Sequence, residues 1–324
     1  MKVHILDDWF DTLRGLPCFE LLKDHDVTVW TDHEPDEAAL AARLQEAECV
    51  VLFRERTRVT RGLLEHLPGL RLISQRGVWP HVDVEACTDH NVLLCSNTGA
   101  DGANYAAAEL TFALILAAMR QLPQQIASAK AGQWQMGVGR TLRGRTLGLY
   151  GYGRIGRVVA DYARAFGMNV LWWSSDAGLA RARAAGEQVA ENREAFFTQS
   201  DIVSLHLRLT AETKGIVTAQ DFARMSPRAL FVNTSRAGLI APGALLDGLN
   251  AGRPGTAAID VFDGEPLTDP TDPLLSHPNL IATPHIGFVT EDEFDKQFAD
   301  IFEQVNAYAD GAPIHMVNPS VFAR

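Results

Sequence analysis

Three polar residues follow predicted strands in the second half of this 324-residue chain: Arg236 in "FVNTSRAG", Glu265 in "AAIDVFDGEP" and His285 in "IATPHIG". Arginine offers a planar fork that matches a carboxylate or a 2-keto acid. Histidine is the usual acid or base near neutral pH. A carboxylate beside the histidine would stabilise the imidazolium and fix the orientation of the ring. The three residue types therefore indicate proton transfer at a bound carboxylic acid.

Each residue also has a purely structural interpretation. Arg236 could be a surface ion-pair partner, Glu265 a solvated loop residue and His285 a satisfied core histidine. Pro284 before the histidine restricts the backbone and Gly287 after it permits close approach, so the sequence predicts that His285 is held in a defined place. The carboxyl ends of strands in an open α/β sheet line its ligand crevice, so we expect the three side chains to face one site.

A glycine loop precedes these residues in "LGLYGYGRIGRVVADYARAFG". The pattern lies between a predicted strand and a predicted helix, the context that a dinucleotide-binding fingerprint requires. Gly151 would form the tight turn, Gly153 would admit a pyrophosphate and Gly156 would let helix and strand pack closely. The phosphates would meet the helix N-terminus at Arg154 and Ile155. The alternative is a glycine-rich turn in an ordinary α/β protein.

The choice of cofactor depends on the end of the next strand, where an acid normally binds the ribose hydroxyls. Here that position is Ser174, followed by Ser175 and Asp176. A serine neither binds a diol with two charged acceptors nor repels a 2′-phosphate. Asp176 could reach the ribose, whereas Arg181 and Arg183 could serve a 2′-phosphate. We expect NAD slightly ahead of NADP, and NADP stays possible.

Strands and helices alternate through the whole chain. Strands are predicted at 3–6, 27–30, 50–53, 70–74 and 92–95, with helices at 36–46 and 61–67. A second series has strands at 146–150, 169–173, 202–205, 230–233, 257–260 and 280–282. This order predicts parallel sheets with helices on both faces.

A long apolar helix over 103–120 and a glycine-interrupted linker, "AGQWQMGVGRTLRG", separate the two series. Trp134 in this linker could touch a cleft, a partner subunit or the core. The amphipathic segment 290–310 is expected to be a helix that packs back on the first series. We therefore predict a discontinuous domain of residues 1–100 plus 288–324, and a second domain of residues 101–287.

Composition excludes several classes of protein. Apolar residues make up 47% and charged residues 21%, which does not suggest disorder. The 29 basic and 40 acidic residues give a net charge of −11, which disfavours binding to nucleic acid or an anionic membrane. The apolar run 110–119 is shorter than the ~20 residues of a membrane span, and the N-terminus is not typical of a signal peptide. The cysteines, Cys18, Cys49, Cys87 and Cys95, show no CxxC spacing and predict reduced, buried thiols in a cytoplasmic protein.

The motifs resemble, in order, those of the D-isomer-specific 2-hydroxyacid dehydrogenase family, through "LGLYGYGRIG", "SDIVSLHLRLTAETKGIV", "MSPRALFVNTSRAGLI", "AAIDVFDGEP" and "NLIATPHIG". The resemblance covers nearly the whole chain. It implies two Rossmann-like, doubly wound α/β domains with a cleft between them, the first flavodoxin-like and holding substrate, the second holding NAD(P). It further implies a catalytic Arg236 and a Glu265–His285 acid/base pair. The expected reaction is hydride transfer between NAD(P)(H) and a D-2-hydroxy or 2-keto acid, in a homodimer and without a metal site.

The resemblance extends to contact residues. For the cofactor it adds Leu207, Thr234, Ser235 and Asp260, the last beside the nicotinamide. The segments "VLFRERTRVT" and "HVDVEAC" resemble loops of the substrate domain. We expect the substrate carboxylate on backbone N–H groups of the loop Arg76, Gly77, Val78 and Trp79. Arg54, together with Arg56 and Arg76, could hold a second anionic group, or the three could form surface ion pairs with Glu55 and its neighbours.

The sequence also departs from the family pattern. Ser174 replaces the usual acid, Arg208 stands where proline is common, and Trp79-Pro80 replaces small residues in the substrate loop. The chain lacks the C-terminal regulatory domain of some phosphoglycerate dehydrogenases, so no serine feedback site is expected. Two other functions stay open: an NAD(H)-binding corepressor-like protein, and a phosphonate or formate dehydrogenase of the same fold. Glu265 argues against the formate enzymes, which carry glutamine at that position.

Overall fold

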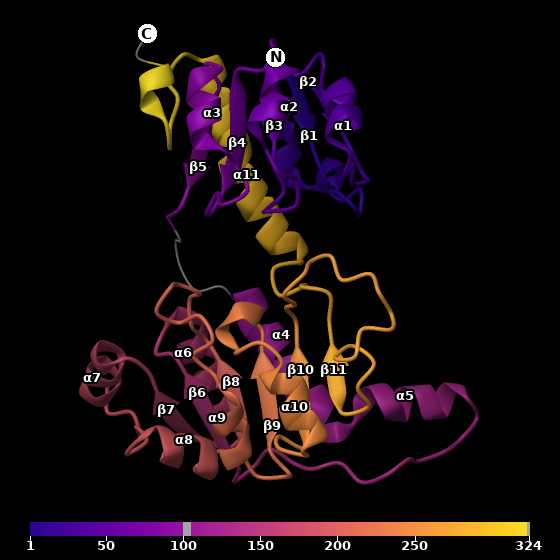
Figure 1. Ribbon diagram of the computed structural model, residues 1–324, viewed down its shortest axis with the longest axis vertical. Helices are drawn as coiled ribbons and strands as arrows, with labels where there is room; N and C mark the ends of the chain where they lie inside the picture. The colour runs from indigo at the N-terminus through magenta and orange to yellow at the C-terminus, as the bar shows by residue number, and fades with distance from the viewer. Residues whose placement is uncertain (100–104, 323–324) are drawn as a thin grey trace. The chain divides into compact units, whose positions relative to one another are not determined.

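The computed structural model describes residues 1–99 and 105–322. The chain divides into two compact units (Figure 1): unit 1 comprises Met1–Asp101 and Val289–Arg324, and unit 2 comprises Gly102–Phe288. Each unit is built on a parallel sheet with helices, which confirms the predicted fold class. The roles of the two units, and the cleft expected between them, stay predictions.

Unit 1 has a five-stranded sheet in the order β2-β1-β3-β4-β5. Its elements are β1 Lys2–Ile5, η1 Leu13–Gly15, η2 Pro17–Leu22, β2 Asp26–Val29, α1 Glu37–Arg43, β3 Cys49–Val51, α2 Arg61–Glu65, β4 Leu72–Arg76, α3 Val84–Asp89, β5 Leu93–Asn97, α11 Glu291–Ala309 and η4 Pro319–Val321. Helix α11, from the C-terminal end of the chain, packs against β4, β5 and η2. It can do so because Phe294, Phe298, Ile301 and Val305 recur every three or four residues and are buried on one stripe.

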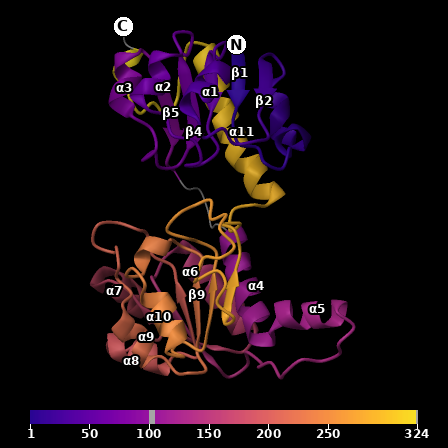
Figure 2. The same ribbon diagram turned by 45° about the vertical axis from the view of Figure 1, so that its right-hand side comes forward.

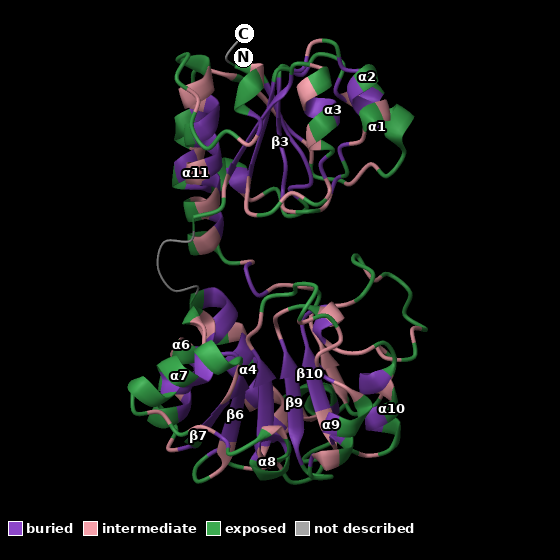
Figure 3. Ribbon diagram, turned by 60° about the vertical axis from the view of Figure 1, so that its left-hand side comes forward, coloured by how far each residue is buried: buried purple, intermediate pink, exposed green. Residues whose placement is uncertain are grey.

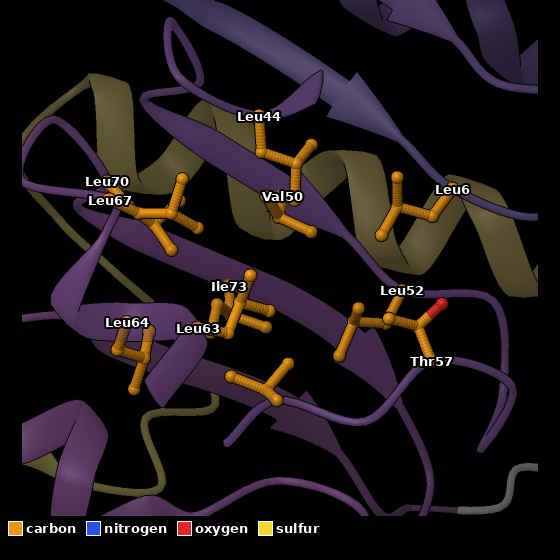
Figure 4. Close-up of a pocket in the computed structure, with 11 residues that line it drawn as sticks. Leu6, Leu44, Val50, Leu52, Thr57, Leu63, Leu64, Leu67, Leu70 and Ile73 are labelled. Carbon is orange, nitrogen blue, oxygen red and sulfur yellow. The ribbon is translucent and has the colours of Figure 1, made fainter. Parts of the chain in front are cut away.

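The core on the other side of this sheet is apolar. Figure 4 shows a small pocket there, in which Thr57 is accompanied by ten apolar side chains. The ten are Leu6, Leu44, Val50, Leu52, Val59, Leu63, Leu64, Leu67, Leu70 and Ile73. With a single hydroxyl and no charged group, this pocket is a packing space of the core and offers little to a carboxylic acid.

Unit 2 has a six-stranded sheet in the order β11-β10-β9-β8-β6-β7. Its elements are α4 Tyr105–Arg120, α5 Leu122–Lys130, β6 Thr146–Tyr150, α6 Arg154–Ala165, β7 Asn169–Trp173, α7 Asp176–Ala184, α8 Arg193–Gln199, β8 Ile202–Leu205, α9 Ala219–Arg224, β9 Leu230–Asn233, η3 Ala237–Leu239, α10 Ala244–Asn250, β10 Thr256–Ile259 and β11 Leu280–Ala282. The chain runs from β6 outward to β7 and then returns to β8 on the other side. The strand order therefore reverses beside β6, where open α/β sheets bind ligands.

The strands of both sheets are largely buried (Figure 3), as the apolar runs in the sequence predict. The strand bounds shift by no more than a few residues, as in β4, which was predicted at 70–74. The first residues of the helix predicted at 103–120 lie outside the described part of the chain. From Tyr105 onward that helix is α4, which packs against α6, β9 and β10.

Helix α5 and the chain that follows it extend away from the sheet of unit 2 (Figures 1 and 2). Helix α5 was not predicted, because it is largely exposed and its sequence therefore lacks an apolar period. Packing of Trp134 in the core, one of the three possibilities, is wrong: the side chain is 84% exposed. No single helix in the described segments is long and apolar enough to cross a membrane, although the bent pair α4 and α5 passes by length and composition together.

Candidate active site

The glycine loop follows β6 at the point where the strand order reverses. Gly151 has φ of +114°, and a Cβ there would lie 2.3 Å from the carbonyl oxygen of His206. A Cβ on Gly156 would lie 2.9 Å from the carbonyl oxygen of Gly151. The protein itself therefore requires both glycines. By contrast, a Cβ on Gly153 would meet nothing nearer than 3.9 Å, so that position faces the space a pyrophosphate would need.

Helix α6 begins at Arg154, immediately after this open position, with Gly153 as its N-cap. Backbone N–H groups in the first turn of a helix have no intrahelical partner and favour anions. His206 lies beneath the loop, and burial lowers the pKa of its imidazole to about 4, so it is neutral at pH 7. The loop consequently offers N–H dipoles from Ile155 and Gly156, in the first turn of α6, without a buried histidine charge. These residues fit the phosphates of a dinucleotide.

Other predicted cofactor residues use their side chains within the protein. The Ser174 hydroxyl accepts a hydrogen bond from the Tyr152 N–H at 3.3 Å, and Ser175 is the N-cap of α7. Thr234 bonds the hydroxyl of Thr111 in α4 at 2.6 Å, and Ser235 donates to the Leu205 carbonyl at 2.7 Å.

These hydroxyl groups shape the rim of the sheet. A cofactor would therefore meet the backbone or the outer surface of these residues. Leu207 is partly buried beside Gly151. The basic side chains considered for a 2′-phosphate, Arg181 and Arg183, are exposed on α7.

His285 and Glu265 lie together on the loops that follow β11 and β10. His285 Nδ1 is 2.5 Å from Glu265 Oε2, and the other carboxylate oxygen accepts from the Phe262 N–H at 2.9 Å. Burial opposes ionisation of Glu265. The hydrogen bonds from His285 and Phe262 and the positive charges of His285 and Arg236 outweigh it, and the pKa of Glu265 is lowered below its ordinary 4.5. The carboxylate is thus ionised at neutral pH.

The backbone of His285 is held in an uncommon conformation with φ of +54°. Asp260, fully buried at the end of β10, maintains it. Its carboxylate accepts from the Thr283 hydroxyl at 2.6 Å, the Ile286 N–H at 2.9 Å and the Gly287 N–H at 2.8 Å. Burial raises the pKa of Asp260, against the effect of these hydrogen bonds. Both carboxylate oxygens are therefore engaged by the chain itself, and the predicted contact with the nicotinamide is untested.

Arg236 begins the turn after β9, and its side chain is exposed. Asn233, which was not among the predicted site residues, shapes this turn. Its amide accepts from the Ser235 N–H at 3.0 Å and donates to the Arg236 carbonyl at 2.9 Å. A buried asparagine between a strand and "TSR" is the signal that could have identified it. Arg236 and Glu265 lie near enough for the arginine charge to act on the carboxylate. The structure thus brings the three predicted catalytic residues to one edge of the sheet.

The predicted substrate residues lie in unit 1. Arg54, with φ of +61°, and Arg76 line one small pocket with Leu52, Phe53, Phe294, Gln297, Phe298 and Ile301. Arg76 Nε is 3.4 Å from Asp300 Oδ2. Arg56 is placed differently: its guanidinium lies 3.8 Å from the ring centroid of Trp9 and 4.1 Å from that of Phe53, and it donates to the Asp7 carbonyl. Arg56 is therefore used in packing, and Arg54 and Arg76 line the same pocket, so the second anion site stays a prediction.

Comparison with known proteins identifies the chain. Residues 112–287 match the family model for the NAD-binding domain of D-isomer specific 2-hydroxyacid dehydrogenases. The chain belongs to this family. It is 34% identical to glyoxylate reductase of Aeropyrum pernix, covering 93% of this chain and 92% of that protein. It is 36% identical to D-3-phosphoglycerate dehydrogenase of Methanocaldococcus jannaschii over 82% of this chain, but spans only 50% of that longer protein.

A solved oxidoreductase structure from Ralstonia solanacearum matches this fold with a TM-score of 0.93 at 46% identity, covering 100% of this chain and 98% of that one. Family membership confirms the predicted resemblance, the class of oxidoreductase and the NAD(H) cofactor. The matched NAD-binding domain contains the glycine loop, Arg236, Glu265 and His285. In the described residues, no group of three or more His, Cys, Asp or Glu side chains is arranged to hold a metal ion.

Proposed function

We propose that this dehydrogenase transfers a hydride between NAD(H) and a D-2-hydroxy acid or its 2-keto acid. The observation that carries the proposal is the contact between His285 Nδ1 and Glu265 Oε2 at 2.5 Å, at the strand ends of the NAD-binding unit. Because Nδ1 is directed to the carboxylate, Nε2 is the ring nitrogen left for substrate, and it has no hydrogen-bond partner in the residues described. A histidine oriented in this way is an acid/base group ready to act on an oxygen.

In reduction, protonated His285 gives its Nε2 proton to the C2 oxygen of the keto acid. Glu265 stays ionised and stabilises the imidazolium before transfer. NADH, when bound at the glycine loop, would supply the hydride to C2, and in oxidation NAD⁺ would accept it. In oxidation, neutral His285 removes the proton of the C2 hydroxyl group. General acid/base catalysis of this kind contributes ~10²–10⁴-fold to the rate.

Arg236 binds the substrate carboxylate through its guanidinium, which is exposed beside the acid/base pair. We also propose that backbone N–H groups of loop 76–79 bind the substrate carboxylate. The glycine loop and the start of α6 hold the pyrophosphate of NAD(H), with Leu207, Thr234 and Ser235 along the rim. We propose NAD over NADP. Efficiency with NADH and NADPH compared in one assay tests this, and a strong NADPH preference would contradict it.

The decisive experiment is a panel of 2-keto acids with NADH, for wild type, His285→Ala and the control His66→Ala. His66 is an exposed histidine at the end of α2 in unit 1. We expect turnover by wild type and the control, and loss of at least ~10²-fold in kcat for His285→Ala with unchanged NADH affinity. Wild-type turnover by His285→Ala would contradict the assignment. An absence of turnover by wild type would favour a cofactor-binding regulatory role.

The same panel addresses the size and charge of the substrate. The panel contains 2-keto acids that carry a phosphate, a second carboxylate or an uncharged group distant from C2, and all of them share the C1 carboxylate. We propose that Arg54 and Arg76, which line one pocket, bind a second anionic group. Better turnover of the uncharged substrates would contradict this proposal.

We further propose that the protein is a homodimer, formed through the extended segment of α5 and residues 131–140. Five large apolar side chains of this segment are exposed: Leu122, Ile126, Trp134, Met136 and Val138. Val138 is 90% exposed and Trp134 84%, far more than a side chain that packs on its own subunit. Analytical ultracentrifugation should show a dimer that Trp134→Ser with Val138→Ser converts to monomer. A monomeric wild type would contradict the proposal.

We also propose a reducing, cytoplasmic location. All four cysteines are free and buried, as the sequence predicts. Burial raises the pKa of Cys18, Cys87 and Cys95 to about 12, which keeps them as unreactive thiols. Cell fractionation tests the location directly.

A further inference from the structure

Two buried side chains beneath loop 76–79 bind its carbonyl groups. Gln75 in β4 and Ser96 in β5 are paired in the sheet register and are almost fully buried. The Ser96 hydroxyl donates to the Gly77 carbonyl at 2.7 Å. The Gln75 amide Nε2 donates to the Val78 carbonyl at 3.2 Å and to the Ser96 hydroxyl at 3.3 Å. The carbonyls of two successive peptide groups are therefore held inward by one side-chain pair.

Because the peptide bond is planar, the direction of each carbonyl group determines the direction of the N–H group that follows it. In a trans peptide the C=O and the N–H of the following residue point in opposite directions. Holding the carbonyls of Gly77 and Val78 toward the core thus turns the N–H groups of Val78 and Trp79 away from it. Neither N–H donates a hydrogen bond to any residue that the structure describes. Val78 itself is 60% exposed.

Residue 77 makes this arrangement of the loop possible. Gly77 has φ of +99°, which bends the chain directly after β4. Its own N–H donates to the Asn97 carbonyl at 3.0 Å and so fixes the start of the loop to β5. The next two N–H groups then project together, the kind of arrangement that binds an anion.

We propose that Gln75 and Ser96 are positioning residues for substrate, which orient the Val78 and Trp79 N–H groups toward the carboxylate. This inference rests on the proposed function and adds residues that never touch the substrate. The Gln75 Oε1 is buried and has no hydrogen-bond partner among the described residues. The two N–H groups of the same amide are both used, one of them on the loop.

Gln304 in α11 provides a matched control. It is also fully buried, and its Oε1 likewise has no partner in the part of the chain that the structure describes. Its Nε2 donates to the Gln75 carbonyl at 3.1 Å and the Asp300 carbonyl at 3.2 Å, both in regular elements and not in the loop. Replacing either glutamine by methionine removes an amide of the same kind from the same unit. The variants differ in whether loop 76–79 loses a hydrogen bond.

The experiment compares Gln75→Met, Ser96→Ala and Gln304→Met with wild type, using NADH and the 2-keto acid that wild type reduces best. We expect the KM for the keto acid to rise about tenfold in Gln75→Met and Ser96→Ala, equivalent to ~1.4 kcal/mol. The kcat should stay within about twofold, because the carboxylate is bound equally in ground and transition states. Gln304→Met should keep the wild-type KM. Thermal melting of each variant reports folding, and we expect Gln75→Met to melt no lower than Gln304→Met.

The neutral amide of the same keto acid is a second readout. Because the amide has no charge but keeps one carbonyl oxygen that can accept from the loop, its kcat/KM should fall much less in Gln75→Met than that of the acid. Equal losses on acid and amide, an unchanged KM in both loop variants, or an equal rise in Gln304→Met would each overturn the inference while leaving the proposed reaction intact. Wild type without activity on any 2-keto acid would overturn the proposed function, and this inference with it. If Gln75→Met fails to fold, Ser96→Ala decides the question.

Discussion

Replacing Glu265 by glutamine tests the acid/base pair at its shortest contact. Opposite unit charges 2.5 Å apart attract by about 1.7 kcal/mol in a medium as polar as water and about 7 kcal/mol at an effective dielectric of ~20. The His285 side chain is 26% exposed and that of Glu265 33%, so we take the lower part of this range, about 2–3 kcal/mol. Loss of that stabilisation from protonated His285 corresponds to a decrease in rate of about 30- to 160-fold.

The geometry adds a second effect of the same sign. One carboxylate oxygen of Glu265 contacts His285 Nδ1, and the other accepts a hydrogen bond from the Phe262 N–H. Glutamine has one oxygen, so either Phe262 loses its acceptor or an NH₂ group faces Nδ1. In the second case the ring must carry its proton on Nε2 in its neutral form, which is a poor acid and cannot act as a base there.

The assay is steady-state reduction of a 2-keto acid by NADH, with NADH affinity measured separately by fluorescence titration. We expect kcat to fall about two orders of magnitude in Glu265→Gln, with NADH binding within about twofold of wild type. Asp263→Asn, an exposed carboxylate in the same loop, is the control and should behave as wild type. A Gln variant within about threefold of wild type in kcat would refute the reasoning.

The dependence on pH follows from the lowered pKa of Glu265. A carboxyl group whose folded pKa lies below its unfolded value contributes stability above the unfolded value, and loses it as pH falls through the folded one. The difference in melting temperature between wild type and Glu265→Gln should therefore persist at pH 7 and shrink as the pH falls below about 4.5. A difference that grows on acidification would contradict the assigned direction.

Three further predictions follow from the same structure. Gly153→Ala should fold with a melting temperature close to that of wild type but bind NADH at least ~10-fold more weakly. Gly151→Ala should be strongly destabilised, because its Cβ would lie 2.3 Å from a carbonyl oxygen. Equal melting temperatures of the two variants would contradict this contrast. Arg236→Ala should raise the KM for the keto acid and lower kcat/KM by ~10²-fold without lowering the affinity for NADH. An equal loss of NADH affinity would show that Arg236 has a different role. The four cysteines should react with a thiol reagent at pH 8 only after denaturation, and rapid labelling of the native protein would contradict their burial.

Much of the fold could be predicted because the strands are short apolar runs bounded by polar or glycine-containing turns. Runs such as 146–150 and 202–205 match their strands without a shift. Helix α5 was missed because it is largely exposed, so burial has not imposed an apolar period on it. The environment of Trp134 could not be predicted for a related reason. The sequence shows an aromatic residue in a linker but does not show whether other residues cover it.

The sequence by itself determined the family of the chain and its class of oxidoreductase. The glycine spacing after an apolar strand, and the order Arg236, Glu265 and His285, depend on local conformation and strand ends, which short-range patterns specify. Tertiary structure alone decided how these groups are held. Asp260 supports the loop of His285 from 25 residues upstream, and Gln75 with Ser96 orients peptide groups across two strands. Such contacts join residues that are distant in the sequence, and no local pattern encodes the distance or direction of a hydrogen bond between them.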